Sequence, residues 1–188
     1  MTGEAEEILS FWIDKVGPDG WYLADAVLDD RIRERFLGLW ERARARGLDG
    51  WSCQPRGSLA LVILLDQFPR NMFRGDPRSF STDREALAVA KAAIGRGFDG
   101  RVGLDARLFF YMPLMHSEIV TDQERAVRLY ALHLGTSAQF LHARAHRAVI
   151  RRFGRFPSRN GVLGRESTPA EADWLASGGY EVALAEVA

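Results

Sequence analysis

Hydrophobic residues recur at helical spacing along almost the whole chain, and alternating strand patterns are missing. We therefore expect an all-α chain of antiparallel helices joined by short loops. Three capping boxes are predicted at helix starts, pairing Thr82 with Glu85, Thr121 with Glu124 and Thr168 with Glu171. The expected helices cover about residues 3–16, 29–46, 57–68, 83–96, 105–112, 122–134, 137–153 and 169–177.

The centre of this fold is predicted at the run LALVILL, Leu59–Leu65. A helix that is apolar on every side is surrounded by other helices, and this one is far shorter than the roughly 20 residues that cross a bilayer. Asp66 follows the run directly, and Pro69 is expected to break or kink the helix there. A buried carboxylate needs a partner, and Arg70 is the nearest candidate.

Composition indicates one globular domain. The chain has 188 residues, and its 25 basic and 25 acidic residues cancel, which argues against nucleic acid or a membrane as partner. Cys53 is the single cysteine, and the first residues are acidic where a signal peptide is basic, so we expect a cytoplasmic location. The oligomeric state is left open.

An arginine-rich stretch follows the helix predicted to end at Gly154. Seven arginines and no acid lie from Arg144 to Arg165, whereas the first 34 residues hold nine acids and only three bases. Phe153 and Phe156 are expected to anchor the loop. Arginine forks suit carboxylates or phosphates, which belong either to this protein or to a ligand. The donors left on the loop are Arg152, Arg155, Arg159 and Asn160.

A second polar segment holds His116 and Glu118, two residues apart. Pro113 is expected to end the preceding helix, which would leave this pair on a non-helical segment before the Thr121 cap. Such a pair can transfer protons, ligate a metal or form a structural hydrogen bond.

Two further histidines, His142 and His146, fall on one partly apolar helix face. We expect His146 to point inward, where a carboxylate such as Glu118 or Asp66 would satisfy it. Ala143 stands where the H-E-x-x-H zinc motif has its glutamate, and no metal or cofactor is expected.

Three segments, LDQFPRNMFRG, YMPLMHSE and RFGRFPSRNGVLGREST, resemble the bacterial family known as domain of unknown function 924. The likeness extends through ILSFW, Trp21 and Trp51, and so covers nearly the whole chain. It implies a helical array similar to a tetratricopeptide superhelix, with about eight helices around the buried one, and it implies no activity. Ser158 departs from the family, which usually has histidine there. The matching polar positions are Asp66, Gln67, Arg70, Asn71, Arg74, His116, Glu118, His146, Arg152, Arg155, Arg159, Asn160 and Arg165.

Two functions are compatible with these residues. In the first, they surround a pocket for a small anionic metabolite, with His116, Glu118 or His146 as acid or base. In the second, the chain is a helical scaffold that docks a protein or peptide, and the polar cluster only locks the loops. Both require the same buried residues, so the sequence does not separate them.

Overall fold

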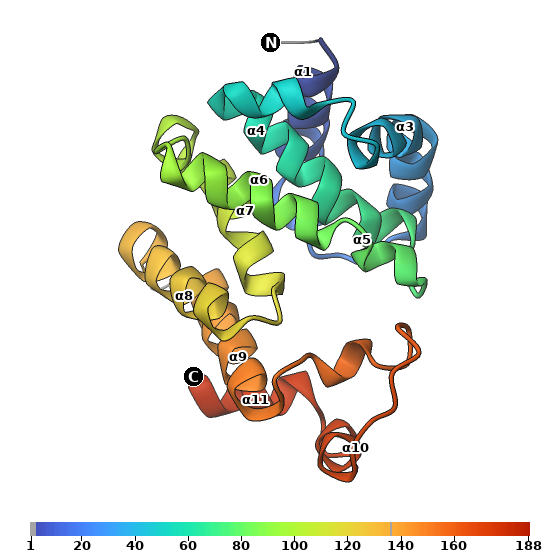
Figure 1. The fold of residues 1–188 in the computed structure, drawn as a ribbon, viewed down its shortest axis with the longest axis vertical. Coiled ribbons are helices and arrows are strands. Elements are labelled where there is room, and N and C mark those ends of the chain that lie inside the picture. The colour runs from blue at the N-terminus through green and yellow to red at the C-terminus, as the bar shows by residue number, and fades with distance from the viewer. Residues whose placement is uncertain (1–2, 136) are drawn as a thin grey trace. The chain divides into compact units, whose positions relative to one another are not determined.

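The structure is a computed structural model that describes residues 3–135 and 137–188. Every regular element in these ranges is helical, which confirms the all-α fold (Figure 1). The chain divides into two compact units, Met1–Pro113 and Leu114–Ala188. The single domain and the tetratricopeptide-like superhelix stay predictions.

The N-terminal unit is built around the predicted central helix. Leu59–Leu65 is buried throughout, as expected. Phe68 lies just beyond it, and its ring packs 4.8 Å from Phe36 and 5.5 Å from Trp12 between ring centroids. The elements of the unit are α1 (Gly3–Leu9), η1 (Ser10–Val16), α2 (Gly17–Gly20), α3 (Ala26–Arg44), η2 (Asp49–Cys53), α4 (Pro55–Val62), η3 (Ile63–Gln67), α5 (Phe68–Met72), η4 (Pro77–Phe80), α6 (Asp83–Gly95), η5 (Asp99–Arg101) and α7 (Leu104–His116), whose last residues belong to the second unit.

Pro69 does not break the central helix, although a break or a kink was expected at this residue. The helix passes through the π-helical turn η3 and continues as α5. Proline has no N–H for the carbonyl four residues earlier, that of Leu65. The hydroxyl of Thr82 donates to this carbonyl at 2.6 Å and accepts from the Trp40 indole at 3.2 Å. A side chain thus replaces the lost helical donor.

The hydrogen bond from Thr82 to the Leu65 carbonyl explains why the predicted capping box at Thr82 was wrong. Thr82 is the N-cap of α6, but its side chain makes no capping hydrogen bond. The box at Thr121 was wrong too, because α8 begins at Val120 with Ile119 as its N-cap. The box of Thr168 and Glu171 is confirmed, with both reciprocal hydrogen bonds present.

Pro113 lies inside α7 instead of ending it. The surrounding residues Leu108–Met115 are buried, and tertiary packing of this kind outweighs the cost of one missing helical hydrogen bond. His116 is therefore the last helical residue, and only Glu118 lies outside the helix.

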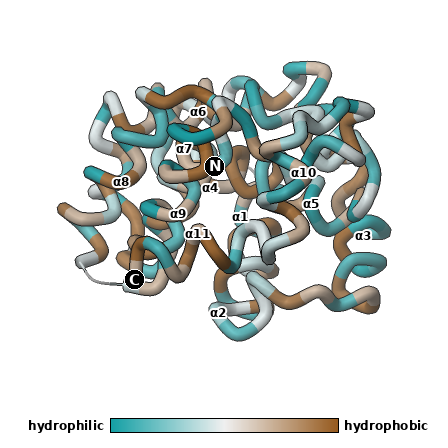
Figure 2. Tube along the Cα trace, turned by 90° about the horizontal axis from the view of Figure 1, so that it is seen from below, coloured by the Kyte–Doolittle hydropathy of each residue, from teal (hydrophilic) through white to brown (hydrophobic). Residues whose placement is uncertain are grey.

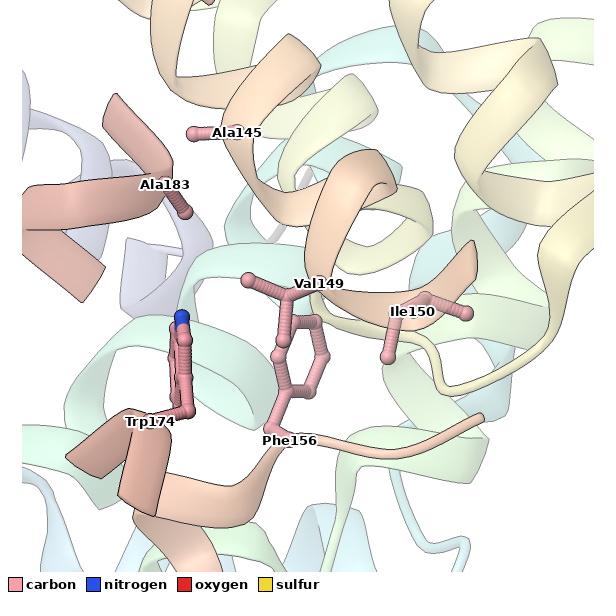
Figure 3. Packing of buried hydrophobic residues seen from close by; sticks show 6 residues of the cluster. All are labelled: Ala145, Val149, Ile150, Phe156, Trp174 and Ala183. Atoms are coloured by element: carbon pink, nitrogen blue, oxygen red, sulfur yellow. The ribbon is translucent and has the colours of Figure 1, made fainter. Parts of the chain in front are cut away.

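The C-terminal unit packs its helices around a small core. Gly154 ends α9 with φ of 72°, as predicted for this glycine. Figure 3 shows Val149 directed towards the ring of Phe156, with Trp174 beside them. The helices carry both hydrophobic and hydrophilic residues (Figure 2). The elements are α8 (Val120–Leu134), α9 (Ala138–Phe153), η6 (Pro157–Arg159), α10 (Pro169–Ala176) and α11 (Tyr180–Val187), the last of which was not predicted.

Candidate functional site

The polar residues after the central helix lie in the N-terminal unit and contact one another. Arg70 donates to both carboxylate oxygens of Asp83, at 2.9 and 3.1 Å, and to the backbone oxygen of Asp66 at 2.6 Å. Burial opposes the charge of Arg70, but the carboxylates of Asp66 and Asp83 outweigh it and raise the pKa of Arg70. Gln67 donates to the side chain of Asp66, and Asn71 donates to the backbone of Gln67.

Arg74 completes this group by a bidentate ion pair. Its guanidinium donates to Asp29 of α3 at 2.8 and 3.0 Å. The pair joins α3 to the turn after α5 across 45 residues of sequence. These contacts give the residues around Pro69 a defined structural task.

In the C-terminal unit, Glu118 joins the segment before α8 to the loop after α9. It accepts hydrogen bonds from the backbone N–H of Phe156 at 2.8 Å and from Arg165 at 2.8 and 3.1 Å. Partial burial opposes ionisation, but Arg165 and the Phe156 N–H outweigh it and lower the pKa of Glu118. A carboxylate with a lowered pKa and occupied oxygens is a poor proton acceptor.

Arg155 has a comparable partner in Glu171 of α10. Its guanidinium donates to the two Glu171 oxygens at 2.6 and 2.7 Å. The side chain of Arg155 and the backbone N–H of Thr168 lower the pKa of Glu171 to about 2. Buried Asn160 donates to Ser167 at 3.0 Å and lies 3.4 Å from Glu171. The loop is therefore held by internal acceptors.

Arg152 and Arg159 differ in their surroundings. Arg152 is exposed and its guanidinium lies 5.0 Å from the ring centre of Phe153. Arg159 lies 4.4 Å above the ring of Phe156 and donates to the backbone oxygen of His116 at 3.1 Å. Arg159 is thus oriented beside the end of α7.

His146 is partly buried, as expected, but its partners are not carboxylates. Its Nδ1 lies 2.8 Å from the backbone oxygen of His142 and 3.1 Å from the hydroxyl of Tyr180. Because a carbonyl oxygen only accepts hydrogen bonds, Nδ1 must carry the proton. The neutral ring then has its lone pair on Nε2.

The surroundings of His146 disfavour a positive charge. Burial is the main cause, followed by the nearby positive charges of His116 and Arg159, and together they lower the pKa of His146 to about 3. The ring centres of His116 and His146 are 6.4 Å apart, and Phe156 lies 5.4 Å from His146. These side chains form what we call the histidine cluster: His116, His142, His146, Phe156, Arg159 and Tyr180.

The second and third predicted segments therefore meet in one unit, and the first forms its own network in the other. Sequence reasoning missed Tyr180 as a site residue, because it follows two glycines and begins a helix of only eight residues. It also missed Glu171 as the acceptor for Arg155, although its place in the capping box was visible.

Three further properties bear on binding. Cavities of about 200, 370 and 440 Å³ lie in the N-terminal unit and are lined by residues other than the predicted site residues. The described part of the chain contains no group of three or more histidine, cysteine or acidic side chains placed to hold a metal. Within residues 3–135 and 137–188, no helix is both long and apolar enough to cross a membrane.

Comparison with known proteins identifies the family. Residues 8–179 match the family described as bacterial protein of unknown function, DUF924. The chain belongs to this family. A solved structure titled as a protein of unknown function, ATU0120 from Agrobacterium tumefaciens, is 46% identical and superposes with a TM-score of 0.87. The match covers 91% of this chain and 96% of that one. None of the curated proteins compared with the chain matches it.

Proposed function

We propose that the DUF924 chain binds a small anionic metabolite at the histidine cluster and exchanges a proton with it through His146. The observation that carries this proposal is the fixed imidazole. The His142 carbonyl holds the proton on Nδ1, so Nε2 is an acceptor of known position. General acid–base chemistry requires a side chain held within hydrogen-bond reach of the proton that it exchanges.

Electrostatics supports an anion at this place. The positive charge of Arg159, and that of His116 when it is protonated, disfavour a proton on His146. A bound anion would offset this repulsion and raise the proton affinity of His146, so that ligand binding and proton uptake would favour each other.

The proposal assigns the other predicted residues to structural tasks. Arg155 and Arg165 hold the loop to Glu171 and Glu118. We place the proposed site at His116, His146 and Arg159, which lie close together in the histidine cluster. The residues that hold the bend at the end of the central helix are Asp66, Gln67, Arg70, Asn71 and Arg74.

A second function, docking of a protein or peptide, is supported by a different observation. Tyr22, Leu23 and Val27 are 55, 61 and 66% exposed at the junction of α2 and α3. Neighbouring exposed apolar side chains are a feature of protein contact surfaces. For either function we propose a cytoplasmic location, since Cys53 is an exposed free thiol.

Thermal unfolding of the full chain tests the first function against phosphorylated and carboxylated metabolites. A ligand that binds the folded state raises the unfolding midpoint. We expect the increase to persist in Arg128→Ala, which removes an exposed cation of the same unit, and to disappear in Arg159→Ala and His146→Asn. Equal increases in all four proteins would place the ligand elsewhere. If no metabolite raises the unfolding midpoint, the docking of a protein or peptide becomes the favoured function.

A further inference from the structure

Tyr180 connects two histidines of the cluster. It is the first residue of α11, and its hydroxyl lies 3.1 Å from Nδ1 of His146 and 2.8 Å from Nδ1 of His142, both on α9. The rings of His142 and Tyr180 are nearly parallel, at 5°, with centres 5.9 Å apart. The three polar groups therefore form a continuous hydrogen-bonded chain.

Which group donates and which accepts in each hydrogen bond follows from the proton on Nδ1 of His146. Nδ1 of His146 carries a proton because it faces a carbonyl oxygen, so the Tyr180 hydroxyl is a second acceptor of that one proton. The hydroxyl proton of Tyr180 is then free to point at Nδ1 of His142, which accepts it. Each donor in the series faces an acceptor, and the arrangement is satisfied without any change of geometry.

We propose that Tyr180 and His142 form a proton path that leads from His146 to the partly exposed side chain of His142. When Nε2 of His146 takes up a proton, the proton on Nδ1 passes to the oxygen of Tyr180. The hydroxyl proton of Tyr180 passes at the same time to Nδ1 of His142. One proton has entered at His146 and one has appeared on His142, and Tyr180 is again neutral. The Nδ1 lone pair of His146 now faces the His142 carbonyl, so this state is short-lived, and transfer in the reverse direction restores the proton on Nδ1.

Two properties of His146 and Tyr180 favour passing an added proton on over retaining it at His146. Burial disfavours a positive charge on His146, so an added proton is poorly retained there. Burial also raises the pKa of Tyr180, which keeps the hydroxyl protonated and able to donate and accept at once. The path rests on the proposed proton exchange at His146 and carries the proton to the partly exposed His142.

The test measures how fast the Nδ1 proton of His146 exchanges with water, by NMR of the full chain labelled at histidine and without ligand. Tyr180→Phe removes only the hydroxyl and keeps the ring that packs against the core of the unit. We expect exchange to slow by about tenfold or more, as for loss of a positioned acid–base group. His142→Asn retains an acceptor for Tyr180 but takes up no proton, and it is expected to slow exchange as well.

A purely structural role of Tyr180 predicts the opposite change in the exchange rate of the His146 Nδ1 proton. Loss of a hydrogen bond then loosens the packing of α11, and exchange becomes faster. An unchanged or faster rate in Tyr180→Phe, relative to Tyr22→Phe as a control in the other unit, would overturn the path. Because no ligand is present, this result is independent of whether any metabolite binds.

Discussion

The carboxylate of Glu118 shows what single residues do in the C-terminal unit. It accepts from a backbone N–H and from a guanidinium, and both partners belong to the loop that carries Arg159. Its effect on the proposed site is therefore indirect, through the position of that loop. Glu124 offers a comparison, because it pairs with Arg147 and Arg151 on a more exposed surface.

We predict that Glu118→Gln destabilises the protein by about 1–3 kcal/mol, because the amide removes the charge that pairs with Arg165 and replaces the oxygen that accepts from Arg165 with an NH2 donor. Glu124→Gln should cost only about 0–1 kcal/mol, as for exposed ion pairs. Urea denaturation of both variants measures the difference. Similar costs would show that the partly buried pair and the exposed pair contribute equally to stability.

At the level of elements, the bend at Pro69 depends on a side chain from another helix. Thr82→Val removes the hydroxyl that serves both Leu65 and Trp40, with little change in shape. We predict a loss of about 1–3 kcal/mol in the free energy of unfolding, because two buried polar groups lose their partner. The control is Thr121→Val, at an exposed position in α8, with an expected change within about 0.5 kcal/mol.

The end of α9 depends on backbone conformation. Gly154 has φ of 72°, and open space surrounds the position of an added Cβ, so the strain of a side chain is conformational. Gly154→Ala should cost about 1–2 kcal/mol, the penalty of a left-handed residue other than glycine. Gly161→Ala, in the same loop but without a positive φ, should change stability by less than about 0.5 kcal/mol. Equal costs in thermal or urea denaturation would contradict this explanation.

These elements show what the sequence could and could not predict. The apolar run, the helix end at Gly154 and the cap at Thr168 depend on neighbouring residues, and all three were predicted. The continuation of the helices through Pro69 and Pro113 depends on residues elsewhere in the fold, as Thr82 shows. Local sequence signals carry no information on such distant partners.

The same limit applies to the candidate site of the whole molecule. The arginine forks were recognised as donors for carboxylates, but their acceptors lie 16 residues away for Arg155 and 47 for Arg165. Tyr180 gave no signal, because its role arises only when α11 packs on α9. Donor chemistry was readable from the sequence, and the choice between internal and external acceptors required the fold.

For the whole molecule we predict that acid lowers stability in two separable steps. The pKa of His146 falls from an ordinary 6.5 to about 3 on folding, and that of Glu171 falls from 4.5 to about 2. In both cases the unfolded state binds more protons between the two values, so the free energy of unfolding decreases as the pH falls through that window. His146 begins to act below about pH 6.5 and Glu171 below about pH 4.5.

Urea denaturation at a series of pH values separates the two contributions. His146→Asn keeps a donor near the His142 carbonyl but does not titrate, so stability should decline less steeply between about pH 6.5 and 4.5. Glu171→Gln should be less stable than the wild type at pH 7 and less sensitive to acid below about pH 4.5. A wild-type slope in His146→Asn would mean that His146 is protonated equally in both states. The neutral, fixed imidazole on which the proposed site depends would then be lost.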